Sequence, residues 1–355
     1  MVYAVVSDIH AYNWSAFGGV DADGVSTRLR VILSELERAA SELLAAGGNL
    51  MIIAGDIFHT RGSIDPEVFN PTHETFRKIL ADGVEIYAIP GNHDLKGRET
   101  NTLGNAIQTL NDLNGFHVIT RNVAYDLEKN GDLIAFVPWC STVAGLRASI
   151  DQILDDVGSE NVTLFIHAGV DGVLPGMPDH GLSAGELADY GFKRVFAGHY
   201  HNHKAMEGGK VISIGALTHQ TWGDIGTKAG FLLVHDDKVV YRASHAPSFV
   251  EVTGDTDPDE VPLLIDGNYV RIRGMKLTDA EISTYRGELK DMGAIGVTFQ
   301  VARETVSARG SATVARARSL DDSVIAYVDG LGVPLVEDVK VECADILSSV
   351  RSVSV

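Results

Sequence analysis

The sequence predicts an α/β protein: a layered sandwich with a mixed sheet, followed by a small α/β unit. Short β-branched apolar runs alternate with amphipathic segments early in the chain, and closely spaced strand signals follow. An acidic, turn-rich stretch over residues 251–260 then separates the C-terminal part. With 355 residues, of which 45% are hydrophobic, the chain can bury one large core and a smaller one.

The early elements alternate between strand and helix. Residues 2–7 are apolar and β-branched, which predicts a buried strand. Residues 26–47 predict a helix because their leucines recur on one face and a glycine pair follows as a stop signal. By the same criteria we expect strands at 50–54 and 84–89 and helices at 71–81 and 103–113.

The later elements are mostly strands, expected at 133–137, 162–166, 194–197, 211–214 and 231–235. With the boundary at 251–260, the domains are predicted as 1–250 and 261–355. The second domain is expected to hold strands at 269–273 and 296–301 and helices at 279–292, 321–329 and 341–349.

Composition restricts the class of protein. No apolar run approaches membrane-spanning length, and the N-terminal residues lack the basic region of a signal peptide. Two distant cysteines form no disulfide framework, so we expect a cytoplasmic protein without a membrane partner. The formal charge of −19 argues against a nucleic-acid partner, unless bound cations offset the negative charge locally. Alternatively, the acidic surface simply maintains solubility.

Potential metal ligands directly follow five predicted strands: Asp8 and His10, Asp56, Asn92 to Asp94, His167, and His199 with His201. Functional groups of open α/β sheets gather beyond the carboxyl ends of their strands. Each motif alone is weak, since an Asp-x-His can be a surface turn and a Gly-Asp can be a helix cap. All five in one chain are hard to explain structurally.

The donor types indicate the metal chemistry. Imidazoles, carboxylates and an amide oxygen suit manganese, iron or zinc, and the lack of cysteine argues against a structural zinc site. Two divalent cations can clamp a phosphate and activate a bridging water, and the two oxygens of Asp56 suit it to bridging them. The sequence therefore predicts a two-metal phosphoesterase.

These motifs resemble those of the calcineurin-like metallophosphoesterase family, whose ordered D-x-H, G-D, G-N-H-D/E, H and G-H-x-H motifs all occur here over about residues 1–240. The resemblance implies the α/β/β/α sandwich of that family with two mixed sheets. It also implies one cation held by Asp8, His10 and His201, a second held by Asn92, His167 and His199, and Asp56 between them. His93 would contact the scissile phosphate and protonate the leaving oxygen, with Asp94 orienting it.

Within the family, the motifs G-D-I-F-H at 55–59 and I-P-G-N-H-D at 89–94 resemble SbcD-type DNA-repair nucleases, including phage-encoded versions. The resemblance implies a manganese-dependent DNA exonuclease, with possible endonuclease activity, acting in repair or recombination near the nucleoid; iron, zinc and magnesium are alternative metals. It implies DNA, an SMC-like ABC ATPase subunit and a second copy of the chain as partners, with the helices near 71–81 and 103–113 as dimer candidates. His59 would help to steer the DNA strand, or would be a helix histidine without a role.

The second domain resembles the DNA-binding cap of those nucleases. Its candidate phosphate contacts are Arg271, Arg273, Lys276, Arg303, Arg309, Arg316 and Arg318. The alternative is a solvated basic surface paired with nearby acids. Two other functions share the motifs: a phosphodiesterase or phosphatase acting on small phosphoesters, and a non-catalytic scaffold, which would usually have lost ligands.

Overall fold

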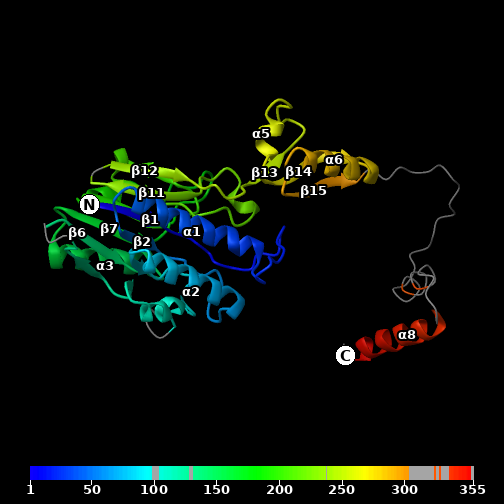
Figure 1. Cartoon of the computed structure of the whole chain (residues 1–355), viewed down its shortest axis with the longest axis horizontal. Helices are drawn as coiled ribbons and strands as arrows, with labels where there is room; N and C mark the ends of the chain where they lie inside the picture. The colour runs from blue at the N-terminus through cyan, green and yellow to red at the C-terminus, as the bar shows by residue number, and fades with distance from the viewer. Residues whose placement is uncertain are drawn as a thin grey trace. The chain divides into compact units, whose positions relative to one another are not determined.

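The computed structural model describes residues 1–97, 104–127, 131–236, 238–303, 324, 328 and 336–352 (Figure 1). The chain divides into two compact units, Met1–Glu304 and Thr305–Val355. The described part of the second unit is chiefly helix α8 (Val336–Ser352), which includes the helix predicted at 341–349. The helix predicted at 321–329 lies almost entirely outside the described residues.

The first sheet has the strand order β12-β11-β1-β2-β3-β4. Strands β1 to β4 run parallel to one another, whereas β11 pairs antiparallel with both β1 and β12. Helices α1 (Thr27–Ala45) and α2 (Pro66–Ala81) cover this sheet. The strands are β1 (Val2–Val6), β2 (Leu50–Ala54), β3 (Glu85–Ile89), β4 (Phe116–Val118), β11 (Gly230–His235) and β12 (Lys238–Ala243).

The second sheet has the order β5-β6-β7-β8-β10-β9 and is also mixed. Helices α3 (Val143–Val157) and α4 (Ala184–Asp189) pack on its outer face. The strands are β5 (Val123–Tyr125), β6 (Leu133–Val137), β7 (Val162–His167), β8 (Arg194–Gly198), β9 (Lys204–Met206) and β10 (Val211–Ser213).

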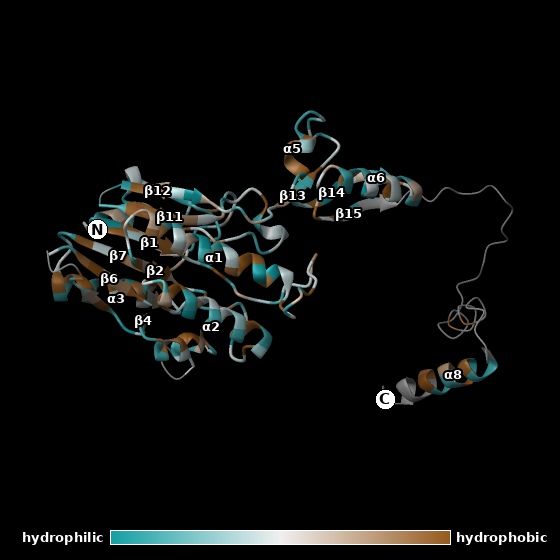
Figure 2. Ribbon diagram, in the orientation of Figure 1, coloured by the Kyte–Doolittle hydropathy of each residue, from teal (hydrophilic) through white to brown (hydrophobic). Residues whose placement is uncertain are grey.

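The alternation of side chains along each strand builds the layers. In β1, Tyr3 and Val5 enter the core between the two sheets, whereas Ala4 and Val6 enter the core beneath α1 and α2. Both faces are therefore buried, which explains the continuous apolar runs. Figure 2 shows hydrophobic residues along the strands, while the covering helices carry hydrophilic residues as well. The predicted α/β/β/α sandwich is confirmed.

Some predicted helices differ from those observed. Helix α2 begins at Pro66, earlier than predicted, because the Asp65 side chain caps it by accepting from the Glu67 amide, and Pro71 is tolerated inside. The segment predicted as a helix at 103–113 is a 3₁₀ helix, η1 (Ala106–Asp112), in its described part. Among the described helices, none is long and apolar enough to cross a membrane.

A third sheet, with the order β13-β14-β15, completes the first unit and is parallel throughout. Its strands are β13 (Phe249–Val252), β14 (Tyr269–Leu277) and β15 (Gly296–Arg303), with helices α5 (Val261–Ile265) and α6 (Asp279–Asp291). It has its own small apolar core. The start of the predicted boundary at 251–260 is thus occupied by the end of β13.

Candidate metal centre

The five predicted motifs converge at the carboxyl ends of β1, β2, β3, β7 and β8. Backbone hydrogen bonds extend the pairing of β1 and β2 beyond the strands themselves. The Asp8 amide donates to the Gly55 carbonyl and the His10 amide to the Asp56 carbonyl, both at 3.0 Å. The loops that follow β1 and β2 are therefore held side by side.

Four of these residues have a left-handed backbone. The φ angles are 50° at Asp8, 48° at His10, 54° at Asp56 and 97° at His199. Non-glycine residues seldom adopt this conformation, which costs about 1–3 kcal/mol each and is found mainly at functional sites. Here it turns the chain sharply at the strand ends, where the side chains converge.

Glycines next to the ligand candidates permit close backbone approach. A Cβ at Gly91 would lie 2.2 Å from the Asp56 Oδ1, and one at Gly55 would lie 2.2 Å from the His167 Nδ1. At Gly198 a Cβ would lie 2.3 Å from the Ala54 carbonyl oxygen. These positions exclude any side chain, which gives a steric reason for the Gly in three of the motifs.

The first ligand group comprises Asp8, His10 and His201, with donor atoms all within 4.8 Å of one another. The Asp8 Oδ1 lies 3.9 Å from the His10 Nε2 and 4.0 Å from the His201 Nε2. The other oxygen of Asp8 accepts from the Ser7 hydroxyl and the His199 amide. Within the described part of the chain, Oδ1 is buried without a hydrogen-bond donor, as a carboxylate oxygen reserved for a cation would be.

The second group comprises Asp56, His167 and His199, joined by Asn92. The Asn92 Oδ1 lies 2.9 Å from the His199 Nδ1 and 3.2 Å from the His167 Nε2. The Asp56 Oδ2 is 3.4 Å from the His167 Nε2 and 3.6 Å from the His10 Nε2. Asp56 thus stands between the two groups, and the donor set would suit two divalent cations, with Asp56 placed near both.

Burial and charge prepare these side chains for cations. Burial lowers the pKa of His10 well below its usual range and that of His199 to about 3, so both imidazoles are neutral and keep a lone pair. Burial acts in the same direction on His167, but Asp56 and Asp8 outweigh it and raise its pKa to about 9. A cation bound by His167 would have to displace a proton from this ring.

Partners behind the ligand candidates fix their ring orientation. The His167 Nδ1 lies 2.7 Å from the Ala54 carbonyl oxygen, and the His201 Nδ1 lies 2.8 Å from the Asp224 Oδ1. In both cases Nε2 faces the ligand group. Sequence reasoning missed Asp224, which closes the 3₁₀ turn η3 (Trp222–Asp224) through a capping box with Thr221. The T-x-x-D pattern signals the capped turn, but not the contact of Asp224 with His201.

His93 and His59 lie together at the mouth of the site. The His93 Nδ1 donates to the His59 carbonyl at 2.6 Å, which leaves Nε2 available to a substrate. The two rings stack with centroids 5.1 Å apart, and the His59 Nδ1 lies 3.3 Å from the His10 Nδ1. His59 therefore faces the same mouth as His93 and contacts a ligand candidate.

The expected role of Asp94 requires correction. Its carboxylate accepts hydrogen bonds from the amides of Ile57, Phe58 and Gly91, and the side chain is fully buried. The His93 imidazole is held instead by the His59 carbonyl. Asp94 thus ties the loop after β2 to the loop after β3. Burial and then the Asp56 charge raise its pKa to about 7.

The structure places the candidate DNA contacts unevenly. The guanidinium of Arg271 is paired with Glu251 at 2.6 Å and lies 4.9 Å from the centroid of the Trp222 ring. Arg273 is more exposed and lies 3.6 Å from the same carboxylate, while Lys276 is exposed. The side chain of Arg303, and Arg309, Arg316 and Arg318 altogether, lie outside the described residues.

Paired Asp and His clusters on an α/β/β/α sandwich define a metal-dependent phosphoesterase. Residues 1–203 match the family described as "Calcineurin-like phosphoesterase", and the chain belongs to that family, whose members bind two divalent metals.

Among curated proteins, the chain is 27% identical over 181 residues to "Exonuclease subunit 1" of Enterobacteria phage T4. The match spans 50% of either chain, so the chain spans about half the length of this relative. Among solved structures, a dimetal phosphatase from Danio rerio aligns with a TM-score of 0.43 and 12% identity, over 68% of this chain and 95% of that one. The protein TT1561 of Thermus thermophilus aligns with a TM-score of 0.42 and 9% identity, over 69% and 99%.

Proposed function

We propose that this phosphoesterase is a DNA exonuclease that works with two manganese ions. The observation that carries the proposal is the likeness to a phage exonuclease subunit, combined with two ligand groups that meet at Asp56. The relative is named as a subunit. We therefore propose that this chain also works with a partner subunit, and that the partner is of the ABC ATPase type. A role in DNA repair or recombination, and a homodimer, belong to the same proposal.

In this proposal Asp8, His10 and His201 hold one cation, and Asn92, His167 and His199 hold the other. Asp56 serves both. The support is the geometry: the Asp8 Oδ1 is buried without a hydrogen-bond donor among the described residues, and the Asp56 Oδ2 lies between imidazoles of both groups. When bound, the cation pair supplies positive charge to the phosphate and lowers the pKa of a water.

The protein's own side chains complete the chemistry. The Nδ1–H of His93 is committed to the His59 carbonyl, so Nε2 is the atom that meets the phosphodiester and gives a proton to the leaving oxygen. The ring is half-buried at the mouth, where it is stacked on His59. The His59 Nδ1 also lies 3.3 Å from the His10 Nδ1, so His59 helps to position that proposed ligand.

Duplex DNA and a chromogenic phosphodiester, assayed side by side with Mn²⁺, test the proposal. We expect release of nucleotides from DNA that stops with a chelator and resumes with Mn²⁺. The test variant is His93→Ala, which should lose turnover. The matched control is His117→Ala, which should keep it, because His117 is a partly exposed histidine on β4 that pairs with Glu85. Turnover of the small ester without any degradation of DNA would contradict the proposal and favour a small-phosphoester enzyme.

A further inference from the structure

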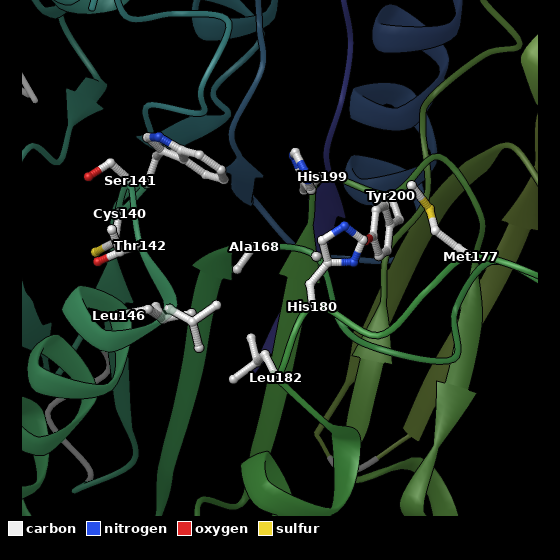
Figure 3. A pocket seen from close by; sticks show the side chains of 13 residues that line it. Cys140, Ser141, Thr142, Leu146, Ala168, Met177, His180, Leu182, His199 and Tyr200 are labelled. Atoms are coloured by element: carbon white, nitrogen blue, oxygen red, sulfur yellow. The ribbon is translucent and has the colours of Figure 1, made fainter. Parts of the chain in front are cut away.

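A cavity of about 210 Å³ opens beside the second ligand group. It lies beyond the carboxyl ends of β6, β7 and β8. Figure 3 shows Cys140 and Thr142 on one side, Ala168 in the middle with Leu182 below it, and His199 with Tyr200 on the other side. His199 lines the cavity and is also a proposed metal ligand. A group that fills the cavity therefore lies next to the proposed metal centre.

Two aromatic rings flank His199 in this cavity. The ring centroid of Trp139 lies 5.3 Å from that of His199, and the ring of Tyr200 lies 5.3 Å from it as well; both are inclined at 35°. The Trp139 amide donates to the Pro90 carbonyl at 3.2 Å, which anchors it to the loop of Asn92. Trp139 is partly exposed and lines the cavity.

Two neighbours, Gly169 and His180, hold the ring of Tyr200 in place. A Cβ at Gly169 would lie 2.7 Å from the Cζ of Tyr200, so a larger residue would push the ring away. The Tyr200 hydroxyl lies 3.3 Å from the His180 Nδ1. The floor is apolar, formed by the buried side chains of Leu146, Ala168 and Leu182.

We propose that this cavity binds the nucleobase of the nucleotide whose phosphate lies at the metal centre. A flat, weakly polar group suits a cavity with aromatic walls and an apolar floor, and each base has a π-face that can stack on such rings. Stacking on these rings is tolerant of base identity, because every base has a π-face. The inference rests on the proposed function because it takes the substrate to be a nucleotide chain.

Calorimetric titration of the manganese-loaded full chain tests the inference without any turnover. The probes are deoxyadenosine 5′-monophosphate and 1,2-dideoxyribose 5-phosphate, which differ only in the base. We expect the nucleotide to bind on the order of tenfold more tightly. That ratio should fall to about one in Trp139→Ala and Tyr200→Ala and persist in Trp139→Phe.

A control variant, Tyr285→Ala, removes an exposed aromatic side chain on α6, away from the metal centre, and should keep the wild-type ratio. Using the ratio within each variant cancels any change in metal or phosphate affinity. Equal binding of the two probes to the wild type, or an unchanged ratio in both alanine variants, would overturn the inference.

The outcome is separable from that of the proposed function. Preferential binding of the nucleotide, lost in the alanine variants, would support the cavity even if the chain failed to degrade DNA. Equal binding together with DNA degradation would overturn the cavity and leave the nuclease proposal standing.

Discussion

Asp224 holds His201 through the ring nitrogen that turns away from the ligand group. The Asp224 Oδ1 lies 2.8 Å from the His201 Nδ1, while the Nε2 of the same ring faces the Asp8 Oδ1 at 4.0 Å. The second oxygen of Asp224 accepts from the amides of Gln220 and Thr221, so the carboxylate itself is fixed. A turn far from the five motifs thus sets the direction of a proposed ligand.

Substitution of Asp224 should therefore weaken one cation site and spare the other. We expect Asp224→Ala to reduce affinity for one of two Mn²⁺ equivalents by about 10–100-fold, because His201 loses the partner that fixes its tautomer and orientation. Equilibrium dialysis against Mn²⁺ measures both equivalents. Asp255→Ala, at an exposed loop position, is the matched control. Equal affinities in the wild type and Asp224→Ala would show that Asp224 does not support a ligand.

Removal of His93 should separate metal binding from turnover. We expect His93→Ala to bind two equivalents of Mn²⁺ and to lower kcat by about 10²–10⁴-fold, the usual contribution of a general acid. His93 contributes only its backbone amide to Asp56, which the substitution keeps. Turnover at the wild-type rate would refute the role of His93, and loss of a metal equivalent would make it a ligand instead.

The close approach at Gly91 should make that position intolerant of even a methyl group. A Cβ there would lie 2.2 Å from the Asp56 Oδ1 and 2.5 Å from its amide nitrogen. We expect Gly91→Ala to lower the free energy of unfolding by about 1–3 kcal/mol and to weaken Mn²⁺ binding, because Asp56 must move. Denaturant titration with and without Mn²⁺ measures both effects.

Gly287 supplies the contrasting control, since it is exposed in α6 and a Cβ there meets nothing within 4 Å. We expect Gly287→Ala to stabilise the protein by about 0.5–1 kcal/mol through helix propensity. A Gly91→Ala variant as stable as the wild type and equally able to bind Mn²⁺ would contradict the packing argument.

The basic residues of β14 should divide into structural and DNA-contacting sets. Arg271 is paired with Glu251 and stacked on Trp222, so Arg271→Ala should cost about 1–2 kcal/mol of stability and leave the salt dependence of DNA binding unchanged. Lys276→Ala should instead lower the slope of log K against log salt by about one unit if Lys276 contacts phosphate. Fluorescence anisotropy over a salt series distinguishes them, and a reduced slope for Arg271→Ala would reverse the assignment.

The sequence was informative wherever a buried strand ended in a ligand-type residue. The run at 2–7 followed by Asp8 located both a strand and its functional end, because parallel strands place their carboxyl ends at one edge of a sheet. Among the strands that were not predicted, β4, β5 and β9 have three residues each, too few to show a period. Helix α3 does carry a sequence signal, with Thr142 as its cap and apolar residues at 146, 150 and 153.

Other features could not be read from the sequence because they depend on contacts between distant segments. Nothing in the order of residues places Asp224 against His201, or directs the Asp94 carboxylate to the amides of Ile57 and Phe58 instead of to His93. The pairing of Arg271 with Glu251 likewise arises only when β13 and β14 align. Sequence motifs identify which donors are present, and the fold decides which partners they find.

Diffraction from a manganese-soaked crystal, recorded at the manganese absorption edge, tests the shared carboxylate directly. We expect two anomalous peaks, one among Asp8, His10 and His201 and the other among Asn92, His167 and His199, with Asp56 coordinating both. A single peak, or peaks that Asp56 does not touch, would contradict the two-cation centre.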